Sequence, residues 1–142
     1  MKISFLKLDS ELPTPHHAHD GDGGVDLYAR IDRRLRPGER DLIPTGVAVA
    51  IPLGYAALVV PRSGLAVKHG LGVVNSPGLV DSGYRGEVQV ILINHGSKAV
   101  DVERGERIAQ LVVVPVAVQD WVEVEDLSDS GRGEGGFGST GR

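Results

Sequence analysis

The sequence predicts an all-β protein, either a sandwich or a barrel, and three observations support this prediction. Short apolar runs recur along the 142 residues, and proline or glycine separates many of them. The two strongest runs, residues 87–94 and 107–118, are rich in Val, Ile and Leu. Only residues 63–68 suggest a helix, and that segment is brief. A protein of this size is most simply one domain with a substantial core.

The expected elements follow from the local patterns. Residues 9–24 contain two prolines, three histidines and three glycines, which predicts a loop, and residues 33–39 predict a charged turn around Pro37-Gly38. The two strongest runs are apolar enough to be buried on both faces, in a core or a subunit interface. We expect strands at residues 3–8, 24–29, 41–43, 46–51, 55–60, 87–94 and 107–118.

Composition excludes several classes of function. A formal net charge of −4 gives no broad attraction to nucleic acid. Cysteine is absent, which excludes disulfides, thiol catalysis and cysteine-ligated zinc. The charged N-terminus is too short for a signal peptide, and no apolar run approaches the roughly 18 residues that a membrane span needs. We therefore expect a cytoplasmic protein with neither a nucleic-acid nor a membrane partner.

Residues 75–86, with the sequence N-S-P-G-L-V-D-S-G-Y-R-G, hold the most informative group of side chains. Short apolar runs flank Pro77-Gly78, which predicts a hairpin with a turn at this dipeptide. Its tip would present backbone groups, the Asn75 amide and the Tyr84 ring, which can bind a planar heterocycle. The carboxylate of Asp81 among them suggests catalysis.

The last twelve residues, 131–142, differ from the rest of the chain. They contain six glycines and one apolar side chain, Phe137. We expect residues 1–130 to form the β-barrel domain and residues 131–142 a flexible tail. A simple disordered terminus is the plain alternative, but Arg132, Ser139 and Thr140 suit a phosphate chain, and Phe137 suits stacking on a base.

Other short motifs are ambiguous when taken singly. Arg62-Ser63-Gly64 suits a phosphate, yet the same residues could form an ordinary turn after a strand. Gln110 could bind a ligand or satisfy a backbone group, and an isolated Asp26 is most often a turn or cap residue. The histidines at 16, 17 and 19 have no partner at metal-ligand spacing, so we interpret them as ordinary loop residues.

Five segments, taken in order, resemble the five-motif set of the trimeric dUTPases (deoxyuridine triphosphate nucleotidohydrolases). They are G-V-D-L-Y-A (24–29), P-R-S-G (61–64), G-L-V-D-S-G-Y-R-G (78–86), R-G-E-R-I-A-Q-L (104–111) and R-G-E-G-G-F-G-S-T-G (132–141). The resemblance implies a jelly-roll-like β-barrel and a homotrimer with active sites between subunits. It also implies that the tail closes over a neighbour's site.

The same resemblance implies a Mg²⁺-dependent hydrolysis of dUTP to dUMP and pyrophosphate. Such an activity limits uracil incorporation into DNA and supplies dUMP for thymidylate synthesis. By analogy with the family, Asp81 activates the water that attacks the α-phosphorus and also receives the 3′-OH. Arg132 acts on the γ-phosphate side, and Asp26 holds Mg²⁺ through the metal's waters.

The family also implies a set of substrate-binding residues. Asn75 and the backbone around Leu79 and Val80 would bind uracil, while the Tyr84 ring would exclude a ribose 2′-OH. The other contacts implied are phosphate binding by Arg62, Ser63 and Gly64, α-phosphate binding by Gln110, stacking on uracil by Phe137, γ-phosphate binding by Ser139 and Thr140, and a position near the substrate for Gln89.

Two alternatives share the fold. A dCTP deaminase needs, by family resemblance, a glutamate near the base, whereas this segment offers the uncharged Asn75 and Ser76. A non-catalytic nucleotide-binding regulator would not need Asp81 or the tail motif. Both features favour the hydrolase.

Overall fold

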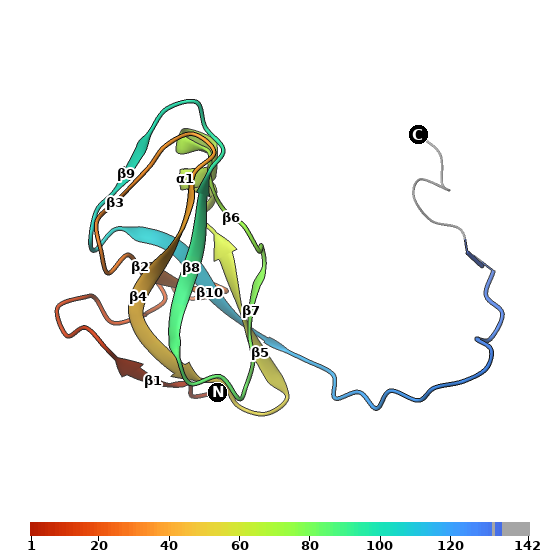
Figure 1. The fold of residues 1–142 in the computed structure, drawn as a ribbon. Coiled ribbons are helices and arrows are strands. Elements are labelled where there is room, and N and C mark those ends of the chain that lie inside the picture. The colour runs from red at the N-terminus through yellow and green to blue at the C-terminus, as the bar shows by residue number, and fades with distance from the viewer. Residues whose placement is uncertain (132, 135–142) are drawn as a thin grey trace.

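The computed structural model describes residues 1–131 and 133–134. Two four-stranded antiparallel sheets enclose the core, and a two-stranded sheet and one short helix lie toward one end (Figure 1). Sheet A has the order β1-β4-β8-β6, sheet B the order β2-β10-β5-β7, and sheet C pairs β3 with β9. The elements are β1 (Ser4–Lys7), β2 (Val25–Tyr28), β3 (Arg33–Leu35), β4 (Arg40–Ala50), β5 (Tyr55–Pro61), α1 (Ser63–His69), β6 (Leu71–Val73), β7 (Gly78–Val80), β8 (Glu87–Asn94), β9 (Val100–Val102) and β10 (Arg107–Pro115).

The predicted all-β class is confirmed, and so is the single short helix after residue 62. Side chains of β4, β5, β8 and β10 form the core between sheets A and B. Within the described residues neither sheet closes on itself, because β1, β6, β2 and β7 are all edge strands. The arrangement is that of a jelly-roll-like fold with open edges.

The predicted hairpin around Pro77-Gly78 is wrong. β6 pairs with β8, through Val73 opposite Leu92, whereas β7 pairs with β5, through Leu79 opposite Leu58. Residues 74–77, which include a cis Ser76-Pro77 bond, therefore connect sheet A to sheet B. Each short strand gains more backbone hydrogen bonds and buried surface from a long core strand than from the other three-residue strand.

A second correction concerns β4. We expected Pro44 to separate two strands, but one strand runs through it from Arg40 to Ala50. The pairing with β8 shifts between Pro44, opposite Gln89, and Ala48, opposite Glu87. Proline is tolerated at such irregularities because it has no N–H to contribute to the ladder.

Sheet C was not expected. Residues 33–35 pair with residues 100–102, although the charges around Pro37-Gly38 had suggested a turn over the whole of 33–39. Strands of three residues are too short for a periodic pattern to identify them. Their pairing depends on long-range contact between segments far apart in the sequence.

In the single chain, β8 is buried on one face only, so the core alone does not cover both of its faces. Val88, Val90 and Leu92 are buried, whereas Gln89 on the opposite face is exposed and Ile91 is half-buried. The burial of that outer face in a subunit interface stays a prediction.

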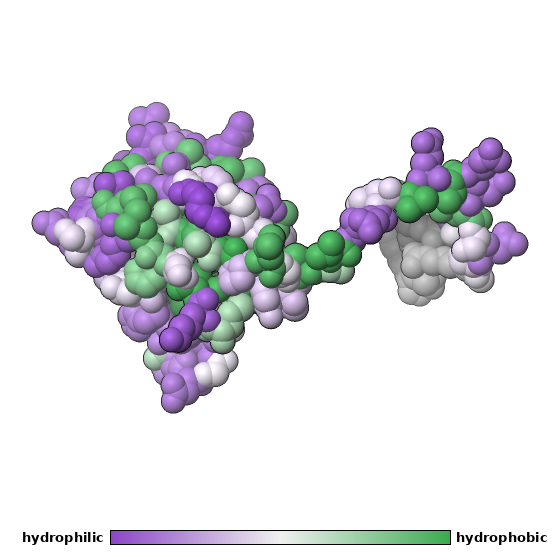
Figure 2. Space-filling model, turned by 90° about the horizontal axis from the view of Figure 1, so that it is seen from below, coloured by the Kyte–Doolittle hydropathy of each residue, from purple (hydrophilic) through white to green (hydrophobic). Residues whose placement is uncertain are grey.

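Regular structure ends at Pro115, three residues before the predicted end of the last strand. Residues 116–131, here called the C-terminal arm, contain neither helix nor strand and run away from the sheets (Figure 1). Apolar side chains occur along the arm (Figure 2). Two of them, Trp121 and Leu127, are almost fully exposed. Among the described residues, no helix has the length and apolar character to cross a bilayer.

Candidate active site

The candidate base Asp81 lies in a tight turn directly after β7. The backbone N–H of Tyr84 donates to the carbonyl oxygen of Asp81 at 3.1 Å, which closes the turn. The Arg85 guanidinium donates to the carbonyl oxygens of Ser82 and Tyr84, each at 2.7 Å. These bonds fix the backbone and leave the Asp81 side chain exposed, as a group that must reach a water molecule should be.

The Tyr84 ring folds back toward the start of β8. Its hydroxyl donates to the carbonyl oxygen of Glu87 at 2.9 Å, and the side chain is 44% exposed. Asp81 and Tyr84 are therefore the two ends of one turn, with a carboxylate at one end and an oriented aromatic ring at the other. The structure places these two predicted site residues in the same turn.

The predicted uracil-binding groups lie just before this turn. β7 is the last strand of sheet B, so within the described residues one of its edges has no partner strand. An edge strand offers unpaired N–H and C=O groups that a heterocycle can bind. Val80 is buried, whereas Leu79 is 62% exposed. Asn75 is exposed and lies beside Gly78: a Cβ added to Gly78 would be 3.1 Å from Asn75 Nδ2.

A second group of predicted residues surrounds Asp26 in β2. Gln110 of β10 is directly opposite Asp26, and Val60 of β5 is opposite Gln110. The Asp26 carboxylate is largely buried and lies between two guanidinium groups. Its Oδ1 is 3.1 Å from Arg62 Nε, and its Oδ2 is 3.5 Å from Arg107 Nη1.

Arg62 is the residue before α1 and also donates to the carbonyl oxygen of Arg107 at 3.2 Å. Ser63 and Gly64 form the first turn of α1, are exposed, and have no acidic residue in that turn. No side chain caps this helix start. The start of α1 is therefore exposed and uncapped, while Arg62 already contacts Asp26 and the Arg107 carbonyl. Phosphate binding by Arg62, Ser63 and Gly64 stays a prediction.

Arg107, the first residue of β10, was assigned no role from the sequence. The pairing of β10 with β2 brings it to the same carboxylate as Arg62. The only signal was its place three residues before Gln110 in the R-I-A-Q motif. No pattern in the sequence indicated that Arg85 would donate hydrogen bonds to the backbone of the Asp81 turn.

Asp26 fits a water-mediated role toward a metal ion better than a direct one. Its Oδ1 is buried and has no hydrogen-bond partner among the described residues, because the nearby Arg62 Nε is close but not aligned to donate. Such an oxygen has an unused acceptor site, which a metal-bound water could fill once the surrounding side chains make room for it. No group of three or more His, Asp or Glu side chains in the described part of the chain could hold the ion directly.

The two clusters lie toward opposite ends of β5. Val80 pairs with Ala57, and Asp81 continues past it in the direction away from Arg62. At the rise of a β-strand, this offset separates Asp81 from Arg62 by roughly 20 Å along the sheet. Within one chain, the residues predicted to bind uracil and deoxyribose therefore lie far from the residues predicted to bind the phosphates.

Several other predicted residues lie away from these clusters or beyond the described part of the chain. Gln89 is exposed on the outer face of sheet A, opposite Pro44. The tail residues Arg132, Phe137, Ser139 and Thr140 lie outside the described residues.

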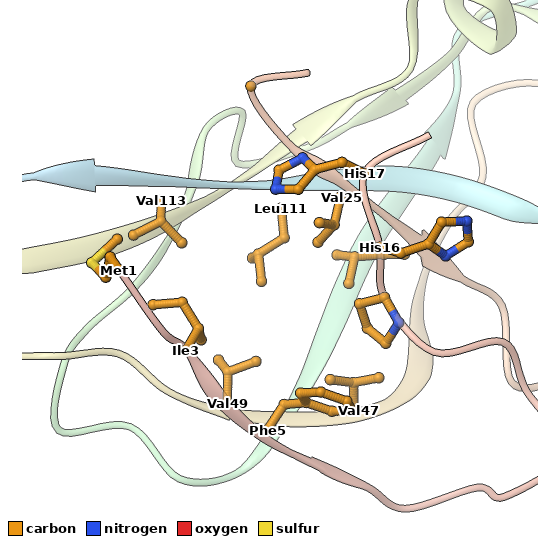
Figure 3. Close-up of a pocket in the computed structure, with 13 residues that line it drawn as sticks. Met1, Ile3, Phe5, His16, His17, Val25, Val47, Val49, Leu111 and Val113 are labelled. Atoms are coloured by element: carbon orange, nitrogen blue, oxygen red, sulfur yellow. The ribbon is translucent and has the colours of Figure 1, made fainter. Parts of the chain in front are cut away.

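An apolar pocket of about 410 Å³ lies elsewhere, between β1 and strands of both sheets (Figure 3). Ile3, Phe5, Val49 and Leu111 are among its lining residues, and His16 and His17 lie at its side. None of the predicted site residues lines it. Its apolar lining does not suit a triphosphate.

Comparison with known protein families identifies the family of this chain. Residues 10–141 match the family model described as dUTPase. The chain belongs to the dUTPase family. The resemblance found in the five motifs is thereby confirmed at the level of the family.

Curated relatives support this assignment over nearly the full length. The deoxyuridine 5′-triphosphate nucleotidohydrolase of Corynebacterium glutamicum is 52% identical over 141 residues, which cover 99% of this chain and 95% of the relative. That of Thermobifida fusca is 54% identical over 142 residues, which cover 99% of this chain and 79% of the relative.

Solved structures of dUTPases have the same fold. The Staphylococcus bacteriophage 80alpha dUTPase with dUpNHpp superposes with a TM-score of 0.91 at 31% identity, covering 99% of each chain. A variant of the dUTPase from phage phi11 of S. aureus, described with a structural Mg(II) ion, gives a TM-score of 0.83 at 25% identity, covering 91% of this chain and all of the other.

Proposed function

We propose that this protein hydrolyses dUTP to dUMP and pyrophosphate. The observation that supports this most directly is the turn from Asp81 to Tyr84, which follows β7, an edge strand within the described residues. It joins an exposed carboxylate, an oriented aromatic ring and unpaired backbone groups. Together these can bind a base and a sugar and activate a water beside them.

In the proposed reaction, Asp81 accepts a proton from a water molecule as the water oxygen attacks the α-phosphorus. The bond from that phosphorus to the bridging oxygen breaks, and pyrophosphate leaves. A positioned general base contributes roughly 10²–10⁴-fold to such a step. The hydrogen-bonded turn supports this role because it limits the positions that the Asp81 carboxylate can take.

The cluster around Asp26 is proposed to bind the phosphates. Arg62 and Gln110 would contact phosphate oxygens, and Ser63 and Gly64 would donate from the start of α1. The Asp26 carboxylate would accept hydrogen bonds from waters on Mg²⁺. When bound, that ion would neutralise phosphate charge and stabilise the leaving pyrophosphate.

The separation of the two clusters supports a site shared between subunits. Asp81 and Arg62 are too far apart in one chain to hold the same α-phosphate closely. We propose that a homotrimer brings the Asp81 turn of one subunit to the Asp26 cluster of another. The tail residues Arg132, Phe137, Ser139 and Thr140 would complete this site.

Selectivity is proposed to arise from the edge of β7 and from Tyr84. Backbone groups of Leu79 and Val80, with Asn75, would match the hydrogen-bonding edge of uracil and leave the amino group of cytosine unpaired. The Tyr84 ring would occupy the space of a 2′-OH. In cells, the activity would limit uracil incorporation into DNA and supply dUMP for thymidylate synthesis, and we propose that it acts in the cytoplasm.

The test is pyrophosphate release with Mg²⁺ from dUTP, UTP, dTTP and dCTP in parallel. We expect turnover of dUTP alone, and none when EDTA removes the metal. Equal turnover of UTP would contradict the role of Tyr84. Release of ammonia from dCTP would indicate a deaminase and would overturn the proposal.

A further inference from the structure

The Tyr84 ring occupies space that only a glycine at position 86 leaves open. A Cβ added to Gly86 would lie 2.6 Å from Tyr84 Cζ and 3.1 Å from Cε2, with the hydroxyl oxygen closer still. Real Cβ atoms almost never approach a neighbour within 3.0 Å. Even an alanine at position 86 would therefore force the ring to move.

The backbone itself does not require glycine at this position. The positive φ angles occur at other glycines, for example Gly54 and Gly70, and Gly86 is not among them. An alanine at position 86 would thus meet no strain of its own. The three atoms nearest to the added Cβ all belong to the Tyr84 side chain, so the clash is with that side chain.

The far end of the ring is fixed by an acceptor that is itself held. Tyr84 donates to the carbonyl oxygen of Glu87, the first residue of β8. The Glu87 carboxylate accepts from the backbone N–H of Gly46 at 2.7 Å and lies 3.4 Å from the Arg30 guanidinium. The hydroxyl bond therefore holds the ring in place, and the missing side chain at Gly86 leaves room for the ring in that position.

We infer that Gly86 is a positioning residue that sets the specificity for the deoxyribose. Without a side chain, it lets the Tyr84 ring lie back toward β8, in the one orientation from which it closes off the position of a 2′-OH. The inference rests on the proposed function. It adds that discrimination against ribonucleotides depends on a residue that need not touch the substrate.

The experiment compares kcat and KM for dUTP and UTP in the wild type, Gly86→Ala and Gly83→Ala. Gly83 lies in the same turn, and an added Cβ there would meet nothing within 4 Å. We expect Gly86→Ala to lower the preference for dUTP over UTP by up to about 100-fold, the discrimination that the shape of a pocket typically gives against one added hydroxyl. The kcat for dUTP should stay close to the wild-type value, and Gly83→Ala should keep the wild-type preference.

Two further variants distinguish an effect on the position of the Tyr84 ring from a general loss of structure at the site. In a Tyr84→Ala background, adding Gly86→Ala should leave the preference unchanged, because Gly86 acts through the ring. Tyr84→Phe keeps the ring but loses the bond to the Glu87 carbonyl, so we expect a smaller fall in preference. Thermal unfolding would reveal whether Gly86→Ala folds. If it does not, the double variant should still fold, because Tyr84→Ala removes the atoms that the added Cβ meets. A double variant that also fails to fold would show that Gly86 does not act through the ring, and would overturn the inference.

The outcomes separate the inference from the proposed function. A folded Gly86→Ala with the wild-type preference, or an additive effect in the double variant, would overturn the inference alone. A Tyr84→Phe that keeps the full preference would remove the role of the hydroxyl bond. A wild-type protein that hydrolyses UTP as well as dUTP would overturn the proposed sugar selectivity, whatever the variants do.

Discussion

Arg62 Nε lies 3.1 Å from Asp26 Oδ1, so a guanidinium predicted to bind phosphate and a carboxylate predicted to serve magnesium share one cluster. The two side chains are 27% and 10% exposed, which places the pair in a partly desolvated setting. There, the carboxylate balances the charge of Arg62 before any phosphate arrives. Anion binding and metal binding at this end of sheet B should therefore depend on each other.

Replacement of Asp26 tests this coupling. We expect Asp26→Asn to raise the Mg²⁺ concentration needed for half-maximal pyrophosphate release, or to lower turnover, by about 10–100-fold, as is typical when an outer partner of a metal is lost. The readout is initial rate over a Mg²⁺ titration. Asp101→Asn, which breaks an exposed pair with Arg34 on sheet C, is the matched control and should change nothing. An unchanged Mg²⁺ dependence in Asp26→Asn would rule out the metal role.

Asp81→Asn separates catalysis from binding. The amide keeps the shape of the side chain but cannot accept a proton from water, so we expect turnover to fall by about 10²–10⁴-fold. Calorimetric titration with dUpNHpp should give an affinity close to that of the wild type. Loss of binding together with activity would instead make Asp81 a substrate-anchoring group.

Removal of residues 131–142 tests the predicted role of the tail. By its composition the tail adds little apolar surface, so light scattering should give the truncated protein the same number of subunits as the full chain. Hydrolysis of dUTP should be strongly reduced, because Arg132 and Phe137 are lost. A change of oligomeric state on truncation would show that the tail holds the assembly together.

Asn94 is predicted to be a major stability determinant. Its fully buried side chain donates to the carbonyl oxygens of Leu35 at 2.9 Å and Lys98 at 2.8 Å, and accepts from the N–H of Gly96 at 2.8 Å. Asn94→Ala leaves these backbone groups without partners, which should cost about 2–3 kcal/mol in the free energy of unfolding. Urea unfolding at one fixed protein concentration measures this loss.

The exposed residue Ser97 in the same turn provides the control for Asn94→Ala. Ser97→Ala should change the free energy of unfolding by no more than about 0.5 kcal/mol. Equal effects of the two substitutions would mean that the buried amide bonds do not hold sheet C to β8.

Asp9 is predicted to make stability depend on acidity. Its Oδ1 accepts from Arg104 Nη2 at 3.0 Å, and the Arg104 guanidinium holds the pKa of the Asp9 carboxyl well below its ordinary value of 3.8. A lowered native pKa stabilises the fold fully above the ordinary value and loses that effect as pH falls toward the native one. The Tm of the wild type should exceed that of Asp9→Asn at pH 7, and the gap should narrow below about pH 4. A constant gap between pH 7 and pH 3 would exclude this linkage.

Much of the fold could be predicted locally. Residues 55–60 and 87–94 have strand patterns that the structure confirms, and the brief helix begins at Ser63. Pro44 misled the prediction because a proline usually ends a strand, and here a shift in pairing accommodates it. The effect of a proline depends on the partner strand, which the local sequence does not identify.

The amino-acid sequence by itself determined the all-β class, the family and the residue types of the candidate site, because strand alternation and short motifs are local properties. Only the tertiary structure decided that residues 74–77 join two sheets, that Arg107 reaches Asp26, and that Asp81 and Arg62 lie toward opposite ends of β5. Strand pairing follows from which registers bury the apolar faces of distant segments together, and no local pattern contains that information.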